Sequence, residues 1–232
     1  MNTLVNCSNV VKTYSGKYAL CGVNLNLERG KIIGLLGPNG SGKTTLIKLL
    51  SGILTPTSGS LQIDGKEIGI ETKKIVSYLP ERTYLNDWMT VEQIIRFFRD
   101  FYADFQAEKA YDMLARLNIN PKDRLKTMSK GTKEKVQLIL VMSRQAELYL
   151  LDEPIGGVDP AARDYILNTI ITNYNENATI IISTHLIYDI ERILDEVIFI
   201  SQGQIRMAAS VDDIRENQGK SIDEMFREVF RC

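Results

Sequence analysis

The sequence predicts an α/β protein built around a mostly parallel β-sheet. The last third of the chain alternates short apolar strands with helices, which implies a parallel sheet covered on both faces. The expected elements of this series are Leu148–Leu151, Pro160–Tyr174, Thr179–Ser183, Leu186–Leu194 and Val197–Ile200. A glycine-rich loop at residues 37–44 lies between an expected strand and an expected helix. An N-terminal antiparallel β subdomain and an inserted α-helical subdomain complete the predicted fold class.

The first 80 residues contain mainly strands, because short apolar runs are separated by Gly, Asp and Ser turn signals. The expected strands are Leu4–Val11, Val23–Leu27, Ile32–Leu36, Ser60–Ile63 and Val76–Leu79. One short helix is expected at Thr44–Leu50. Asp64-Gly65 is typical of a hairpin turn, although it could also simply end a strand.

The middle third is predicted to be helical. A capping box at Thr90 and Gln93 precedes one helical stripe of apolar residues, Val91, Ile94, Ile95 and Phe98. Further helices are expected over Ala107–Leu117 and from near Gly131 to about Arg144. We therefore expect one domain over residues 1–232, with a helical subdomain inserted at about 83–145.

Composition narrows the class of protein. The 232 residues are 44% hydrophobic and 25% charged, with 28 basic and 29 acidic side chains, so we expect a globular protein without a nucleic-acid partner. Apolar stretches such as Val136–Met142 are far shorter than the ~20 residues that cross a bilayer. Met1–Val11 does not resemble a signal peptide. Three scattered cysteines, Cys7, Cys21 and Cys232, suit a reducing cytosol.

The glycine-rich loop has the pattern of a phosphate-binding loop, in the strand-to-helix context that its chemistry requires. Its backbone N–H groups can converge on phosphate oxygens at a helix N-terminus. Lys43 adds positive charge for the β- and γ-phosphates, and the Thr44 hydroxyl can bind Mg²⁺. The residues assigned to nucleotide binding are Gly37, Pro38, Asn39, Gly40, Ser41, Gly42, Lys43, Thr44 and Thr45.

Two adjacent carboxylates follow the apolar strand Leu148–Leu151. Asp152 can hold the water shell of Mg²⁺, and Glu153 can activate a water for attack on the γ-phosphate. Solvated turn residues would explain such a pair by themselves. The phosphate-binding loop elsewhere in the chain favours the functional interpretation.

A second anion site is possible where Ser129 and Gly131 open a predicted helix, because backbone N–H groups are free there. Alone, this segment would be an ordinary N-cap. With the two preceding motifs in the same order, however, essentially the whole chain resembles the ABC ATPase family. Ser129 and Gly131 match the signature of that family, whereas Lys130 and Thr132 depart from it and resemble the bacterial exporter branch.

The resemblance implies a P-loop NTPase core in which two chains enclose two ATP molecules, each signature segment reaching the ATP of the other chain. It further implies that Tyr14 stacks on adenine, although Tyr14 could be a surface aromatic. His185, the only histidine, matches a residue near the γ-phosphate, although a lone histidine is often structural. The segment 157–159 resembles a loop that contacts the second subunit, and a helix-opening turn explains it almost equally well.

Glu81 departs most clearly from the family, because a carboxylate replaces the usual amide. We expect Glu81 to join Thr44 and Asp152 in binding Mg²⁺; the alternative is that it swings away and contacts a membrane permease. After Glu81, the apolar side chains Tyr84, Leu85 and Trp88 are expected to form a surface that contacts a partner. The alternative is that they pack into the core of the helical insertion.

The resemblance implies an ATP- and Mg²⁺-dependent ATPase that powers transport by a separate integral membrane permease. A second ATPase subunit, identical or different, would complete the dimer at the cytoplasmic face of the cell membrane. The alternative within the family is a nucleotide-gated clamp on ribosomes or DNA, but this chain has one cassette, no heptad run and no basic excess. An unrelated kinase or GTPase would leave Ser129, Gly131 and His185 without a role.

Overall fold

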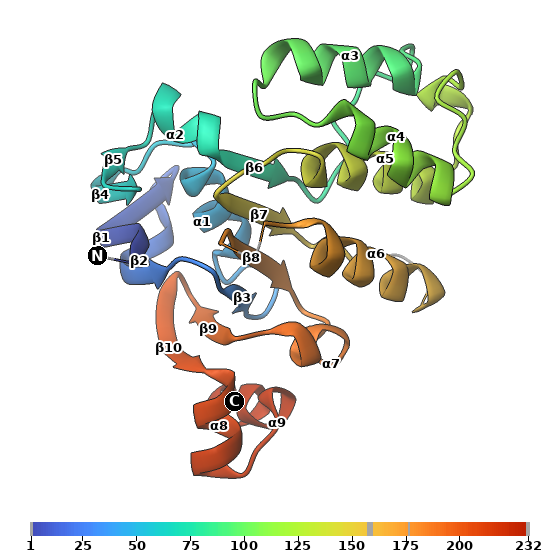
Figure 1. The fold of residues 1–232 in the computed structure, drawn as a ribbon. Helices are drawn as coiled ribbons and strands as arrows, with labels where there is room; N and C mark the ends of the chain where they lie inside the picture. The colour runs from blue at the N-terminus through green and yellow to red at the C-terminus, as the bar shows by residue number, and fades with distance from the viewer. Residues whose placement is uncertain (1, 157–159, 176, 231–232) are drawn as a thin grey trace.

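A computed structural model describes residues 2–156, 160–175 and 177–230. Its larger sheet has six strands in the order β10-β9-β3-β8-β7-β6 (Figure 1). These strands are β3 (Ile32–Leu36), β6 (Val76–Leu79), β7 (Leu148–Asp152), β8 (Thr179–Thr184), β9 (Glu196–Ser201) and β10 (Gln204–Ser210). All neighbours pair in parallel except β10, which is antiparallel to β9. The α/β fold class with a mostly parallel sheet is confirmed.

The central strands are apolar throughout because both of their faces are covered. Every residue of β3, β7 and β8 is buried. In β7, Leu148 and Leu150 belong to a core shared with the N-terminal sheet and α1 (Lys43–Leu50), whereas Tyr149 and Leu151 belong to a core shared with the helical subdomain. Successive side chains of a strand point to opposite faces of the sheet. The large sheet therefore contributes to two hydrophobic cores, one on each face.

The smaller sheet is antiparallel, with the strand order β2-β1-β4-β5. Its strands are β1 (Thr3–Tyr14), β2 (Lys17–Glu28), β4 (Ser58–Ile63) and β5 (Lys66–Glu67). Asp64 and Gly65 form the β4–β5 hairpin, with φ angles of 54° and 69°. Positive φ at both central residues is the type I′ geometry, so the hairpin alternative predicted for this dipeptide is the correct one.

The helical subdomain consists mainly of α3 (Val91–Phe101), α4 (Ala107–Arg116) and α5 (Lys130–Met142). The predicted capping box is present, since Thr90 Oγ1 accepts from Gln93 N at 3.3 Å and Gln93 Oε1 accepts from Thr90 N at 2.9 Å. The predicted stripe of α3 is buried. In Figure 1 these helices lie together beside β6 and β7. The boundaries at about 83–145 stay a prediction.

Several elements differ from the sequence prediction. The helix expected at Leu186–Leu194 is wrong as one unit, because α7 (Ile187–Ile190) gives way to a 3₁₀ turn at Glu191–Ile193. Asp195 follows at once, and its Oδ2 accepts from Ile32 N at 2.7 Å, which ties the chain to β3. Elements that were not predicted include α2 (Ile70–Ile75), β10, α8 (Val211–Gln218) and α9 (Ile222–Val229).

The C-terminal helices pack on the outer end of the large sheet. Phe226 and Phe230 of the α9 segment contact Phe199 of β9, with ring centroids 5.7 and 5.9 Å apart. Among the described residues, no helix combines the length and the apolar character needed to cross a membrane. Helix α6 (Pro160–Asn173) completes the fold on the face that carries α5 (Figure 1).

Candidate active site

The candidate active site lies at the carboxyl ends of β3, β7 and β8, the edge where parallel α/β sheets bind ligands. A cavity of about 880 Å³ opens there. It is lined by Ala19, Asn39, Gly40, Ser41, Gly42, Lys43, Thr44, Thr45, Glu81, Arg82, Thr83, Met128, Lys130, Lys133, Glu134, Glu153, Gly156 and His185. The structure therefore brings most of the predicted loop into one cavity with Glu81, Glu153 and His185.

The glycine-rich loop takes a conformation that only small residues allow. Gly42, the N-cap of α1, has φ 113°, and a Cβ atom there would lie 2.7 Å from Ala19 O. Gly40 also has positive φ, at 77°. Such backbone is strained for residues with side chains. The loop thus exposes the N-terminus of α1, whose N–H groups and dipole favour an anion.

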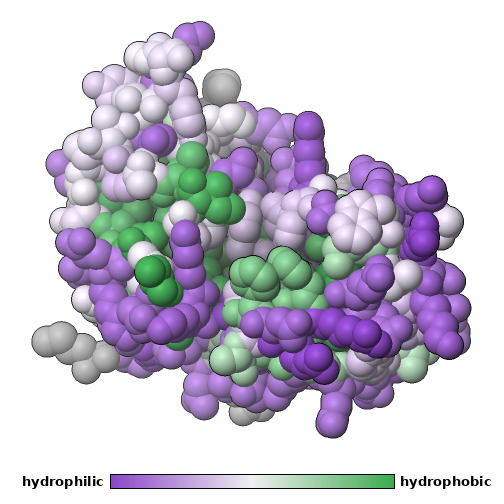
Figure 2. Space-filling view, turned by 90° about the horizontal axis from the view of Figure 1, so that it is seen from above, coloured by the Kyte–Doolittle hydropathy of each residue, from purple (hydrophilic) through white to green (hydrophobic). Residues whose placement is uncertain are grey.

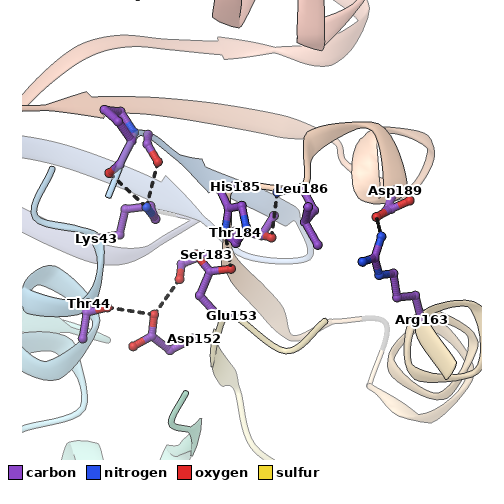
Figure 3. Close-up of polar contacts among 12 residues, drawn as sticks. Lys43, Thr44, Asp152, Glu153, Arg163, Ser183, Thr184, His185, Leu186 and Asp189 are labelled. Atoms are coloured by element: carbon purple, nitrogen blue, oxygen red, sulfur yellow. Dashed lines mark hydrogen bonds and ion pairs between the residues drawn. The ribbon is translucent and has the colours of Figure 1, made fainter. Parts of the chain in front are cut away.

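Lys43, the first residue of α1, is nearly fully buried. Its Nζ donates to Gly37 O at 2.7 Å and to Pro38 O at 3.3 Å (Figure 3). Burial lowers the pKa of Lys43, an effect that nearby Glu153, Asp152 and Glu81 oppose. A phosphate would supply the negative partner that a buried ammonium needs.

Asp152, at the end of β7, joins the loop to β8. Its Oδ1 accepts from Thr44 Oγ1 at 3.1 Å and from Ser183 Oγ at 2.6 Å (Figure 3). Its Oδ2 is buried without a hydrogen-bond partner among the described residues. Burial raises the pKa of Asp152, because the charged carboxylate is desolvated.

This arrangement fits Mg²⁺. An unpartnered carboxylate oxygen beside a threonine hydroxyl supplies the hard oxygen atoms that Mg²⁺ prefers, and phosphates and water usually complete its shell. Within the described ranges, no group of three or more His, Cys, Asp or Glu side chains could hold a metal. Glu81 lines the cavity, and its charge contributes to raising the pKa of Asp152, after burial and Glu153. The assignment of Glu81 as a ligand of Mg²⁺ stays a prediction.

Glu153 and His185 form a pair at the cavity wall. Glu153 Oε2 lies 3.1 Å from His185 Nδ1, and the Glu153 side chain is 13% exposed against 50% for His185 (Figure 3). Glu153 has φ 51°, unusual for a residue with a side chain, and its N–H donates to Ser183 O at 2.9 Å. The strained backbone turns the carboxylate out of the sheet and toward the cavity.

Tyr14, Ser129 and Gly131 are among the predicted residues that lie outside the lining of this cavity. Tyr14 ends β1, is 45% exposed, and has Lys12 Nζ 5.4 Å from its ring centroid. Ser129 is the exposed N-cap of α5, where its Oγ accepts from Thr132 N at 3.2 Å, and a Cβ atom at Gly131 would meet nothing within 4 Å. The segment 157–159 lies outside the described residues. Met128 and Lys130 of the signature segment line the cavity, whereas Ser129 is exposed and does not belong to the lining.

Sequence reasoning missed Ser183, whose hydroxyl holds Asp152. The signal available was a polar residue at the end of an apolar strand, but only the parallel pairing of Asp152 with Ser183 shows that the two meet. It also missed Lys133 and Glu134, which line the cavity from the first turns of α5. Their chain positions, just past the signature segment, gave no sign that α5 borders the cavity.

Comparison with known proteins agrees with this geometry. Residues 20–156 match the ABC transporter family. The chain is 31% identical to the ABC transporter ATP-binding protein YtrB of Bacillus subtilis over 216 residues, covering 92% of this chain and 74% of YtrB. It is 29% identical to the linearmycin resistance ATP-binding protein LnrL of the same organism over 224 residues, covering 93% and 72%. A solved structure of the ATP-binding subunit of an ABC transporter superimposes with a TM-score of 0.89 at 29% identity, covering 99% and 100%. With the phosphate-binding loop, paired carboxylates and signature segment all in place, this chain belongs to the ABC transporter family of ATPases.

Proposed function

We propose that this ATPase powers transport by a separate membrane permease, and that two ATPase subunits close on ATP and open after its hydrolysis. The observation that supports the proposal best is the convergence of Lys43, Thr44, Asp152, Glu153 and His185 on one edge of the sheet (Figure 3). This set supplies at least one group for each need of phosphoryl transfer to water, namely anion binding, metal binding, proton acceptance and positioning.

In the proposed reaction, the N-terminus of α1 and Lys43 bind the phosphates and neutralise their charge. Glu153 accepts a proton from a water molecule as the water oxygen attacks the γ-phosphorus. The bond between that phosphorus and the bridging oxygen breaks, and ADP and phosphate leave. His185 holds the Glu153 carboxylate in place through the 3.1 Å contact. Thr44, Asp152 and Glu81 would hold Mg²⁺, which offsets the charge of the phosphates when bound.

A second ATPase subunit would complete the site. Ser129 and Gly131 face open space, and the helix N-terminus that they form can bind an anion. A partner's γ-phosphate would fill this position if two chains pack head to tail. Closure would then be stabilised by nucleotide contacts that exist only in the closed dimer.

The permease is proposed to contact the face that carries α2 and α3. Seen from that side, hydrophobic patches interrupt a largely hydrophilic surface (Figure 2). Four large apolar side chains there are at least half exposed: Ile53, Ile70, Phe97 and Phe101. Tyr84 and Trp88 are also exposed, at 54% and 64%, whereas Leu85 packs against the core. Exposed apolar area of this kind is typical of protein interfaces.

A groove of about 450 Å³ adjoins this surface, and we call it the aromatic groove. Its lining includes the aromatic side chains Tyr78, Tyr84, Phe98 and Tyr102 and the cations Lys48, Lys73, Arg82 and Arg144. Arg144 pairs with Asp104 at 3.0 Å, and among the described residues that line the groove none is a carboxylate. The groove therefore suits an apolar segment of the permease that carries an acidic side chain.

The test begins by searching the neighbouring coding sequences for a multi-span membrane protein, and continues by reconstituting any such protein with this chain. We expect the two proteins to form a complex whose ATP hydrolysis responds to the transported substrate. Arg82→Glu should weaken the complex, while Arg206→Glu, an exposed substitution on β10 at the opposite edge of the sheet, should not. Failure to assemble with any neighbouring membrane protein, together with ATPase activity that ribosomes or DNA stimulate, would favour the clamp alternative.

A further inference from the structure

Gln137 is a buried polar residue that the reaction described above does not use. It lies in α5, eight residues after Ser129, within the run Val136–Met142 whose residues are all buried. The other members of this run are apolar, and Gln137 itself is 3% exposed. An amide in such a place is costly to bury unless each of its polar atoms has a partner.

One end of the Gln137 amide binds the strand end that precedes Glu81. Its Nε2 donates to Pro80 O at 3.2 Å. A carbonyl oxygen can only accept, so this contact fixes the nitrogen toward Pro80 and turns Oε1 away from it. A second bond, from Ser77 Oγ to Val141 O at 3.0 Å, holds the same strand to the same helix. Two hydrogen bonds therefore join α5 to β6 and to Pro80, the residue that follows this strand.

The other end of the amide, Oε1, is buried without a partner among the described residues. Gln137 lines a small cavity of about 20 Å³, and the polar side chains around it include Glu81, Asp152 and Glu153. A cavity of roughly 10–15 Å³ is sufficient to hold one water molecule. Carboxylate side chains of the same lining offer such a water a second acceptor. One water can donate a hydrogen to each of two acceptors.

We propose that Gln137 is a positioning residue of the hydrolytic site. Its Oε1 binds one water in the small cavity that Asp152 and Glu153 also line. With Nε2 on Pro80 and Oε1 on this water, the amide fixes the Glu81 segment and the two carboxylates at the end of β7, Asp152 and Glu153, relative to α5. Because Ser129 is the N-cap of α5, the same side chain ties the signature segment of this chain to its own metal and water-activating groups. A shift of α5 on dimer closure would then reach Glu81 and Asp152 directly.

This inference rests on the hydrolytic role proposed for Glu153, and its first test does not require activity. A crystal structure of the wild-type subunit at a resolution that shows ordered water should place one water within hydrogen-bond distance of Gln137 Oε1. Gln137→Met, which keeps the length and removes both polar atoms, should lack that water. A wild-type structure in which Oε1 meets no water, or meets a protein donor, would overturn the proposal.

The second test separates positioning from packing. Gln137→Met should lower kcat about 10–100-fold, the usual effect of losing a supporting partner in an active site, with KM for ATP changed less than about twofold because the phosphate-binding loop is untouched. Leu140→Met is the matched control, since Leu140 is buried in the same helix and does not belong to the described lining of this cavity. A kcat equal to that of the control would contradict the proposal. Inactive wild-type protein would instead count against the hydrolytic role, while the water test would still decide the inference.

Discussion

His185 Nδ1 lies 3.1 Å from Glu153 Oε2, although the two residues are 32 positions apart in the chain. The contact exists because each residue follows the end of its own strand, and β7 and β8 are parallel neighbours. The histidine can thus fix the carboxylate that we propose as the general base.

Removal of the Glu153 carboxylate should slow hydrolysis without preventing ATP binding. For Glu153→Gln we expect turnover to fall by about 10²–10⁴-fold, the usual contribution of a general base. The variant should accumulate as an ATP-dependent dimer, which light scattering can detect. Glu108→Gln, an exposed substitution in α4, serves as the control. Near-normal turnover of purified Glu153→Gln would move the assignment of the base to His185.

Asp152 should make stability depend on pH. Burial raises the pKa of Asp152 in the folded protein, so the folded state holds this proton more tightly than the unfolded chain does. The stability linked to this group is therefore lost as the pH rises through the folded pKa. We expect Asp152→Asn to have a higher Tm than wild type at about pH 8, with the difference shrinking toward about pH 4. Scanning calorimetry of the nucleotide-free protein at the two pH values would measure these differences in Tm, with the exposed Asp100→Asn as the control.

If the difference in Tm is absent at alkaline pH, or is equally large at acid pH, the Asp152 carboxylate is not destabilised by burial in the way described. Its unpartnered Oδ2 would then need another explanation.

Glu81 should make ATP binding depend more strongly on Mg²⁺. A third carboxylate near Asp152, Glu153 and the triphosphate repels ATP when no cation is present, and Mg²⁺ offsets that repulsion. We expect Glu81→Gln to bind ATP more tightly than wild type in metal-free buffer and to gain less from added Mg²⁺. Titration of ATP at a series of Mg²⁺ concentrations measures this, with Glu67→Gln of the exposed β5 hairpin as the control. Identical curves for Glu81→Gln and wild type would place Glu81 away from the metal.

Tyr14 stays a predicted adenine-binding residue. If its ring stacks on the base, Tyr14→Ala should lose about 1–3 kcal/mol of binding free energy, which is roughly a 5- to 150-fold rise in the Kd for ATP. Tyr18, on the other strand of the same hairpin, is 68% exposed and provides the matched Tyr18→Ala control. Isothermal titration would show the difference, and equal Kd values for the two variants would rule out a specific role for Tyr14.

Trp88, the only tryptophan, should report on permease binding. At 64% exposure it should emit as a solvated indole and be quenched by iodide in the isolated subunit. Binding of the permease should shift the emission of Trp88 to the blue and protect it from quencher, because the indole ring loses its contact with water. An unchanged spectrum in a complex shown to be intact would place the permease on another face.

The sequence alone was sufficient for the chemistry that depends on neighbouring residues. The glycine-rich loop needs its glycines and Lys43 within eight positions, and the capping box of Thr90 needs Gln93 three positions later. Such patterns have a local physical cause, so they could be found without coordinates. The apolar strand before Asp152 and Glu153 could also be predicted from the sequence, because parallel strands are buried on both faces and are apolar throughout.

Only the tertiary structure decided which distant groups meet. The Ser183 bond to Asp152, the water-sized cavity beside Gln137 and the aromatic groove all join segments far apart in the chain. The C-terminal helices escaped prediction because they are short, eight residues each, and isolated helices of that length are marginal without packing. Strand order and register determine these contacts, and a side-chain pattern of period two does not specify which strand lies next to which.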